Sequence, residues 1–140
     1  YGGTMRLGAY AALLKDKTQV LKLYEETGRL NEDTKKLKEL MKNKSESFRI
    51  GILEKGKKIV LERHRHRYEA NPKYVEILEK NGLVFSGYYV RGDGTKLMEY
   101  IELPGHPFFI GTQAHPEFKS RLGNPSPFFY GFVKACGNRK

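Results

Sequence analysis

The hydrophobic pattern of the chain changes period several times, which predicts alternating strands and helices. Residues 8–14 alternate with a period of two and favour a short buried strand. A short helix is predicted over residues 18–25, and a second helix is expected to begin at Asn31, whose side chain can cap a first turn. The apolar stripe of this second helix is narrow, so we expect it to be peripheral.

Further β-rich runs follow in the middle and later parts of the chain. Residues 48–54 and 57–62 flank Gly56, which can adopt positive φ, so they predict a β-hairpin. Three more strands are expected, at residues 83–90, 96–103 and 108–113. Because helical and strand patterns alternate, the predicted fold class is α/β.

Two more helices are predicted from capping residues and helical spacing. One is capped by Asn71, has Pro72 in its first turn and ends at Gly82. Its inward side chains are expected to be Tyr74, Ile77 and Leu78. The last helix starts at Ser126, and its core stripe is expected to contain Phe129, Phe132, Val133 and Cys136.

Composition narrows the class of protein. The 140 residues suffice for one domain, and no apolar run approaches the roughly 20 residues that span a bilayer. A single cysteine and the lack of a secretory signal pattern favour a cytoplasmic protein that binds no membrane. The chain begins at Tyr1, inside a glycine-rich turn and without an initiator methionine, so we expect the natural polypeptide to extend upstream.

The net charge of +10 raises the alternative of a nucleic-acid-binding module. Residues 35–67 hold twelve Lys and Arg against four Glu, and Arg63, Arg65 and Arg67 could contact phosphates beside a stacking Tyr68. The aromatic residues otherwise cluster in predicted core elements, and no nucleic-acid-binding motif is present. A solvated basic face is the simpler interpretation, and no nucleic-acid partner is expected.

Zinc binding is a second alternative, through His64 and His66 with His106 or His115. Cysteine pairs at metal-ligand spacing are absent from the sequence, so we expect no metal site. Cys136 falls near the end of a helix on its apolar stripe, where the helix dipole and burial both disfavour a thiolate. We therefore expect a structural cysteine rather than a nucleophile.

His115 and Glu117, separated by Pro116, have the side chains of two members of a Cys-His-Glu triad. Such a triad needs a thiolate, an imidazole that moves its proton, and a carboxylate that fixes the tautomer of the imidazole. Proline favours extended backbone at the preceding residue, and side chains two apart on an extended segment project to the same side. The ring and the carboxylate can therefore lie together.

Four motifs, in order, resemble the CTP synthase family: G-G-T-M-R-L-G from Gly2, R-H-R-H-R-Y-E from Arg63, N-P-K-Y from Asn71 and G-T-Q-A-H-P-E-F from Gly111. The similarity is to the C-terminal portion of the class I glutamine amidotransferase (glutaminase) domain. It covers most of residues 1–24 and 62–136, while residues from about 25 to 60 form an insertion relative to typical members. The insertion is interpreted as a surface helix and hairpin, or else as a contact with another subunit or domain.

The resemblance implies a three-layer, flavodoxin-like α/β domain, with a mixed sheet flanked by helices, within an enzyme that aminates UTP to CTP. Such an enzyme uses ATP and Mg²⁺, takes ammonia from glutamine, responds to GTP as an effector and assembles as a homo-oligomer. For this chain alone, the resemblance implies no cofactor. The nucleophilic cysteine of the family lies in a G-x-C-x-G-x-Q motif that would precede Tyr1, so the fragment alone is expected to be inactive.

The resemblance also implies roles for individual residues. His115 would be the general acid and base, and Glu117 would orient it. Arg67 would bind the glutamine substrate, because a guanidinium matches a carboxylate in bidentate fashion. Three further residues are expected near the GTP effector site: Leu7, Arg63 and Arg65.

Overall fold

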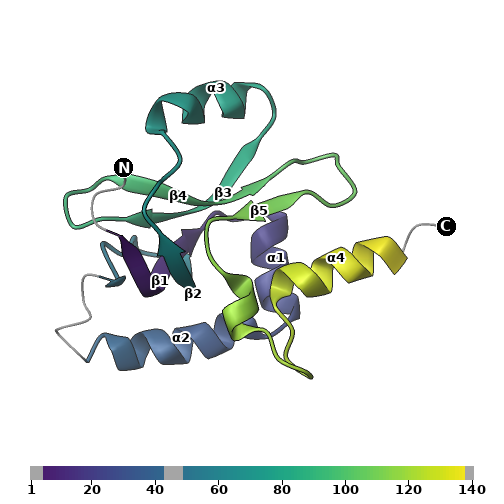
Figure 1. Ribbon diagram of the computed structural model, residues 1–140, viewed down its shortest axis with the longest axis horizontal. Helices are drawn as coiled ribbons and strands as arrows, with labels where there is room; N and C mark the ends of the chain where they lie inside the picture. Colours follow the sequence, from purple (N-terminus) through teal and green to yellow (C-terminus); the bar gives the residue numbers. More distant parts are fainter. Residues whose placement is uncertain (1–4, 43–48, 138–140) are drawn as a thin grey trace.

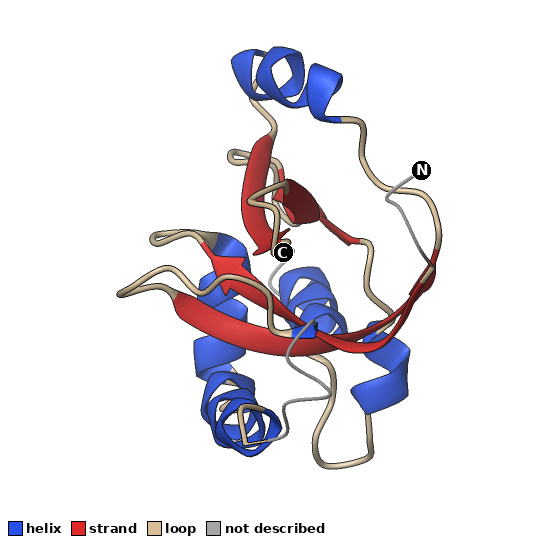
Figure 2. Ribbon diagram, turned by 90° about the vertical axis from the view of Figure 1, so that its left-hand side faces the viewer, coloured by secondary structure: helices blue, strands red, loops and turns tan. Residues whose placement is uncertain are grey.

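The computed structural model describes residues 5–42 and 49–137, and a curled five-stranded sheet forms the centre of this part of the chain (Figures 1 and 2). The strands are β1 (Arg6–Leu14), β2 (Lys58–His66), β3 (Val84–Val90), β4 (Lys96–Glu102) and β5 (Ile110–Thr112). Their order in the sheet is β2-β1-β3-β4-β5. A mixed sheet was expected, but every pair among these described strands is antiparallel.

The helices divide between the two sides of the sheet. They are α1 (Gln19–Glu26), α2 (Arg29–Leu40), α3 (Val75–Lys80) and α4 (Pro127–Gly137), with short 3-10 helices η2 (Pro72–Tyr74) and η3 (Pro116–Lys119). Helices α1 and α4 pack on the face of the β1–β2 ladder that carries Ala12 and Val60, whereas Leu37 of α2 packs on the opposite face with Ala11 and Leu61. Figure 1 shows α3 apart from these helices, at the top of the view beyond β3 and β4. The chain thus forms an α/β arrangement of a sheet between helices.

The strands β1 and β2 pair along their whole length, from Arg6 opposite His66 to Leu14 opposite Lys58. The predicted hairpin is wrong, because β2 takes β1 as its partner and residues 49–54 form no strand; residues 43–48 lie outside the described part. Gly51 explains the difference. It adopts a φ of 66°, and a Cβ there would lie 2.1 Å from the carbonyl oxygen of Val90. The next amide, of Ile52, donates to the same oxygen at 2.9 Å, so this segment bonds to the end of β3 instead of to β2.

Helix α1 forms where the sequence predicts it, because both its ends and its inner face are satisfied. The Thr18 side chain accepts a hydrogen bond from the Leu21 amide at 3.2 Å, as an N-cap should. The carboxylate of Glu102, at the end of β4, accepts hydrogen bonds from the amides of Gln19 and Val20, both at 3.0 Å. A negative charge at this helix end is favourable, so β4 helps to fix the start of α1.

Helix α2 differs from the prediction in its start and in its burial. It begins after Gly28, which has a φ of 72°, rather than at Asn31. It is not peripheral, because Asp33 is fully buried and its Oδ2 accepts a hydrogen bond from the Leu61 amide at 3.0 Å. The inward face combines Leu37 with this carboxylate, which an apolar stripe alone does not reveal.

The apolar stripes predicted for α3 and α4 lie in solvent in the described structure. Tyr74 and Ile77 are 60% and 56% exposed, although Gly82 does close the helix as expected, with a φ of 93°. On α4 the residues expected in the core are also exposed, namely Phe129, Phe132, Val133 and Cys136. Helix α4 instead buries Phe128 and Gly131, and a Cβ at Gly131 would meet the Leu23 side chain at 2.8 Å. The close approach of α4 to α1 at Gly131 therefore determines which face of α4 is buried.

Candidate active site

His115 and Glu117 lie in direct contact, as the sequence predicts. The His115 Nδ1 atom is 2.7 Å from Glu117 Oε1, and the two side chains are 36% and 52% exposed. This hydrogen bond is the largest cause that lowers the pKa of the Glu117 carboxyl below its ordinary value. A charged carboxylate facing Nδ1 places the proton of a neutral ring there, which leaves Nε2 as the acceptor nitrogen.

The backbone around this pair is not the extended segment that was expected. Glu117 lies in the first turn of η3, and His115 precedes that 3-10 helix with a φ of −104°. The His115 amide donates a hydrogen bond to the Arg63 carbonyl oxygen at 2.8 Å, and its ring stacks on Phe118 with centroids 5.1 Å apart. The end of β2 and the start of η3 therefore fix the imidazole together.

A buried lysine anchors the other end of η3. The Lys119 ammonium lies 2.7 Å from Asp33 Oδ1 on α2 and 3.4 Å from Glu62 Oε1 on β2, and it also donates to the Leu61 carbonyl oxygen. Lys119 is only 13% exposed, and Asp33 is fully buried. Lys119 and Asp33 were not predicted as site residues, and the only signal in the sequence is a lysine two positions after Glu117.

The residues expected near an effector site share one face of the β1–β2 ladder. Leu7 pairs with Arg65, and Arg63 pairs with Ala9 in the same register. Leu7 is 60% exposed, and both arginines are exposed as well. The Arg63 guanidinium lies 5.3 Å from the centre of the Phe118 ring, so this exposed face adjoins the His115 site.

Arg67 follows the end of β2 and is exposed. In the described residues no hydrogen bond or ion pair joins it to His115 or Glu117. The structure thus brings His115 and Glu117 together and places Arg67 on a separate, nearby segment. Its guanidinium is available for a ligand.

A buried polar cluster lies between these segments. Arg6 pairs with Glu69 at 2.7 Å and with Glu99 at 2.6 Å. The two histidines of the R-H-R-H run also join it, with His64 Nδ1 2.9 Å from His66 Nε2. The sequence did not identify this cluster, although the alternation of Arg and His on β2 is the pattern that turns the histidines inward and the arginines outward.

Burial strongly shifts the titration of this cluster. Desolvation, followed by the nearby Arg6 charge, lowers the pKa of His64 to about 2. Desolvation raises the pKa of Glu99 to about 7, although Arg6 opposes the shift. His64 is therefore a neutral hydrogen-bonding group, and among the described residues no group of three His, Cys, Asp or Glu side chains is arranged to hold a metal ion.

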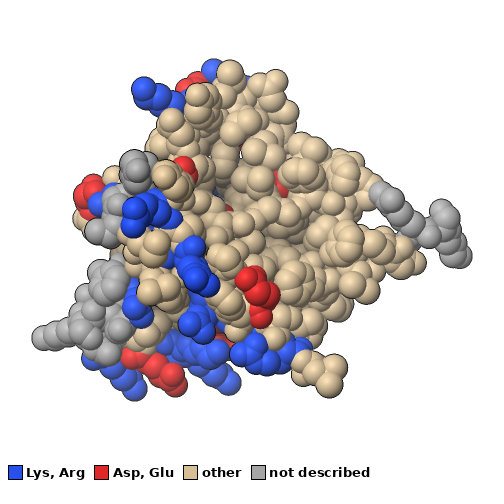
Figure 3. All heavy atoms as spheres, viewed as in Figure 1, with Lys and Arg blue, Asp and Glu red and all other residues tan. Residues whose placement is uncertain are grey.

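Basic side chains gather on one part of the surface. Figure 3 shows Lys and Arg over the left and lower part of the molecule, in the region of β1, β2 and α2, whereas the part around α4 is mostly uncharged in this view. The exposed lysines of α2 and its C-terminal turn are Lys35, Lys36, Lys38 and Lys42. This surface continues the exposed arginines of β2.

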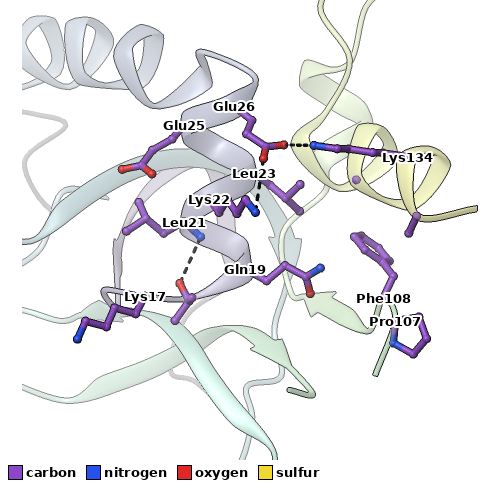
Figure 4. A pocket seen from close by; sticks show the side chains of 13 residues that line it. Lys17, Gln19, Leu21, Lys22, Leu23, Glu25, Glu26, Pro107, Phe108 and Lys134 are labelled. Carbon is purple, nitrogen blue, oxygen red and sulfur yellow. Dashed lines mark hydrogen bonds and ion pairs between the residues drawn. The ribbon is translucent and has the colours of Figure 1, made fainter. Parts of the chain in front are cut away.

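A cavity of about 660 Å³ lies between α1, α4 and residues 107–108 (Figure 4). The ion pair between Glu26 and Lys134, at 2.8 Å, bridges the two helices beside it. None of the residues predicted for catalysis or substrate binding lines this cavity.

Comparison with known proteins defines the class of the chain. The profile of the family described as Glutamine amidotransferase class-I matches residues 6–135. The chain therefore belongs to the class-I glutamine amidotransferase family, and the predicted fold class is confirmed. No helix in the described ranges 5–42 and 49–137 is both long and apolar enough to cross a membrane.

Curated relatives narrow the resemblance to one enzyme. The chain is 46% identical over 139 residues to the CTP synthase of Methanoregula boonei, which covers 99% of this chain and 20% of that protein. It is 48% identical over 137 residues to the CTP synthase of Saccharolobus solfataricus, covering 98% and 19%. The resemblance to CTP synthases is confirmed, and the chain spans about one-fifth of the length of these relatives.

A solved structure gives the same result at the level of the fold. The glutaminase domain of Trypanosoma brucei CTPS with bound acivicin superposes with a TM-score of 0.67 and 30% sequence identity. The match covers 98% of this chain and 41% of that chain. The described elements thus correspond to part of a larger domain of that kind.

Proposed function

We propose that this chain is the part of a CTP synthase glutaminase domain that supplies the general base and its orienting carboxylate. The observation that carries the proposal is the 2.7 Å contact between His115 Nδ1 and Glu117 Oε1. Membership of the class-I glutamine amidotransferase family and the CTP synthase names of the relatives support the reaction class.

In the proposed reaction a cysteine thiolate from another segment of the enzyme attacks the side-chain amide of glutamine. Nε2 of His115 accepts the thiol proton and gives it to the amide nitrogen, so the C–N bond breaks, ammonia leaves and a thioester remains. Water then hydrolyses the thioester to glutamate, with Nε2 taking a proton from the water and returning it to the sulfur, while Glu117 holds the imidazole in the required tautomer. Cys136 is not assigned this step. It is exposed rather than buried as expected, and it lies near the C-terminal end of α4, an element that contributes no residue to the His115–Glu117 pair.

Substrate binding is assigned to the exposed guanidinium of Arg67, which would hold the α-carboxylate of glutamine in bidentate fashion. The whole enzyme would then use the released ammonia to convert UTP to CTP with ATP and Mg²⁺, as a homo-oligomer. The exposed face formed by Leu7, Arg63 and Arg65 would contact the GTP effector, because guanidinium groups suit phosphate oxygens.

The proposal is tested by replacing His115 in the full-length enzyme that contains this chain. His115→Ala is expected to lower glutamine hydrolysis at least ~100-fold, because general acid–base catalysis contributes about that much. CTP formation from added ammonium should persist. Both rates are measured with the same preparation, so a folded synthetase part is verified at the same time.

His106→Ala is the matched control, because His106 lies in an exposed loop and its Nδ1 accepts a hydrogen bond only from the nearby Phe108 amide in the described contacts. This variant should retain glutamine hydrolysis. Glutamine turnover that survives in His115→Ala would refute the assignment of the base. The isolated chain is expected to release no ammonia from glutamine, because the nucleophile belongs to another segment.

A further inference from the structure

One buried carboxylate connects three segments around the candidate active site. Glu69 Oε1 accepts a hydrogen bond from Arg6 Nε at 2.7 Å, and Oε2 accepts one from Arg6 Nη2 at 3.1 Å. The same Oε2 atom accepts a hydrogen bond from Gln113 Nε2 at 2.9 Å. The Glu69 side chain is only 6% exposed, so water competes little for these bonds.

The positions of these partners in the chain relate them to the proposed chemistry. Glu69 lies two residues after Arg67, and Gln113 lies two residues before His115. The Glu69–Gln113 bond therefore joins the segment that carries the proposed substrate-binding guanidinium to the segment that carries the proposed base. Arg6 adds the start of β1, and through Glu99 at 2.6 Å it also reaches β4.

We propose that Glu69 is a positioning residue for glutamine hydrolysis, which fixes the separation between the Arg67 guanidinium and the His115 imidazole. Glu69 touches neither the substrate nor the reacting atoms in this scheme. It holds two segments so that a glutamine anchored on Arg67 presents its side-chain amide beside His115. The inference rests on the proposed function, because it concerns the geometry of the same site.

The negative charge of Glu69 is required as well as its hydrogen-bonding capacity. Arg6 is nearly buried, and its guanidinium is shared between Glu69 and Glu99. Removing the charge of one partner leaves a buried cation less compensated, so Arg6 should shift towards Glu99. Gln113 also donates to the Met98 carbonyl oxygen, and it would then follow β4 rather than the Arg67 segment.

A displacement of about 1 Å between a binding group and a catalytic group can lower a rate by about 100-fold. In the full-length enzyme, Glu69→Gln is therefore expected to raise the KM for glutamine and to lower kcat/KM by roughly 10- to 100-fold. CTP formation from ammonium should stay unchanged. Glu69→Asp keeps the charge on a shorter side chain and is expected to recover part of the loss.

Glu102→Gln is the matched control. Glu102 is also a carboxylate that is 6% exposed, but it caps α1 instead of joining the Arg67 and His115 segments. The control should lower thermal stability and leave the kinetics of glutamine hydrolysis close to the parent values. A general loss of stability would affect both variants, whereas a positioning role affects only Glu69→Gln.

A double substitution tests the coupling directly. In an Arg67→Ala background, Glu69→Gln should add little to the increase in KM, because the group that it positions is already absent. The proposal is overturned if Glu69→Gln changes kcat/KM for glutamine by less than twofold, if Glu102→Gln changes it equally, or if the two substitutions at 67 and 69 act additively. Failure of the proposed function has a different signature, namely glutamine hydrolysis that survives in His115→Ala.

Discussion

Two buried regions of the molecule are built on different physical principles. Between α1, β4 and α4 the core consists of aromatic and aliphatic side chains, with Tyr24 edge-on to Phe128 at 5.8 Å and to Tyr100 at 6.2 Å. Near the His115 site, buried charged groups take the place of apolar ones, with Arg6 between Glu69 and Glu99 and Lys119 between Asp33 and Glu62. The first region stabilises the domain, and the second fixes the positions of the segments around the candidate active site.

This difference follows from the energetics of burial. Apolar packing has no directional requirement beyond shape, and each large side chain contributes about 1.5–3 kcal/mol when buried. A buried ion pair gains little net stability because both charges lose their hydration, but breaking one costs about 3–5 kcal/mol. The ionic region therefore adds little net stability but holds the segments that it joins in fixed positions, as a catalytic site requires.

Two substitutions that cost a similar free energy of unfolding, one in each region, should therefore differ in their effect on glutamine hydrolysis. Phe128→Ala should destabilise the α1–α4 region by about 3–5 kcal/mol and leave the KM for glutamine unchanged. Asp33→Ala should cost about as much, because it leaves Lys119 poorly compensated, but it should also lower glutamine turnover, since η3 carries Glu117.

Native-state hydrogen exchange separates the two effects in the full-length enzyme. The amide of Val20 reports on the apolar region, and the amide of His115, which donates to the Arg63 carbonyl oxygen, reports on the ionic one. Equal changes in glutamine kinetics for both variants would contradict the division between stabilising and positioning regions.

A smaller effect is expected from pH, and it should be confined to the ionic region. Native His64 has a pKa of about 2 against an ordinary 6.5, so only the unfolded state binds this proton between those values. The contribution of neutral His64 to the free energy of unfolding is thus complete above pH 6.5 and is lost progressively as the pH falls towards about 2. The pKa of Glu99, raised from 4.5 to about 7, has the opposite effect, because its contribution is present below pH 4.5 and is lost as the pH rises through 7.

The two trends oppose each other between pH 4.5 and 6.5. His64→Gln should therefore remove the loss of stability on acidification and leave the trend of Glu99. The measurement is exchange of amides in β1 and β2 at a series of pH values from about 4 to 8. If the stability of the variant falls as steeply below pH 6.5 as that of the parent, then His64 does not cause the loss of stability in acid.

The smallest effect is expected at the cavity between α1 and α4. Lys134→Ala removes the exposed ion pair with Glu26, and such pairs contribute little because water screens both charges. Neither glutamine hydrolysis nor thermal stability should change measurably. A clear loss of glutamine hydrolysis in Lys134→Ala would show that the cavity has a function, and would contradict the separation of a stabilising region from a positioning region.

Local signals in the sequence were sufficient for most elements. The first short helix, the Gly82 terminus and the first strand each depend on neighbouring residues, and each is found close to where it was predicted. The predicted alternation of β1 is not seen, because residues 10–14 are all buried. The contact between His115 and Glu117 was also predicted, because residues two apart are constrained by the backbone between them.

The errors concern partners that lie far away in the sequence. The hairpin was wrong because β2 pairs with β1, and α2 is buried because Asp33 finds Lys119 eighty-six positions later. Periodicity identified an apolar stripe on α4 but could not determine that Phe128, and not Phe132, would turn inward. Glu69 remained unnoticed because its importance lies in its three hydrogen bonds, which only the folded chain creates.

The outward arginines of β2 have a consequence for the behaviour of the chain in solution. Within the described sheet, β2 is an edge strand of nine residues. Asp33, Lys119 and His115 already bond its outward backbone groups at Leu61 and Arg63, and the rest of the edge could still pair with a second copy. Arg63 and Arg65 would bring like charges together in such a pairing and so oppose aggregation. Salt screens this repulsion within a Debye length of ~8 Å at physiological ionic strength, so high salt weakens the protection that these guanidinium groups give.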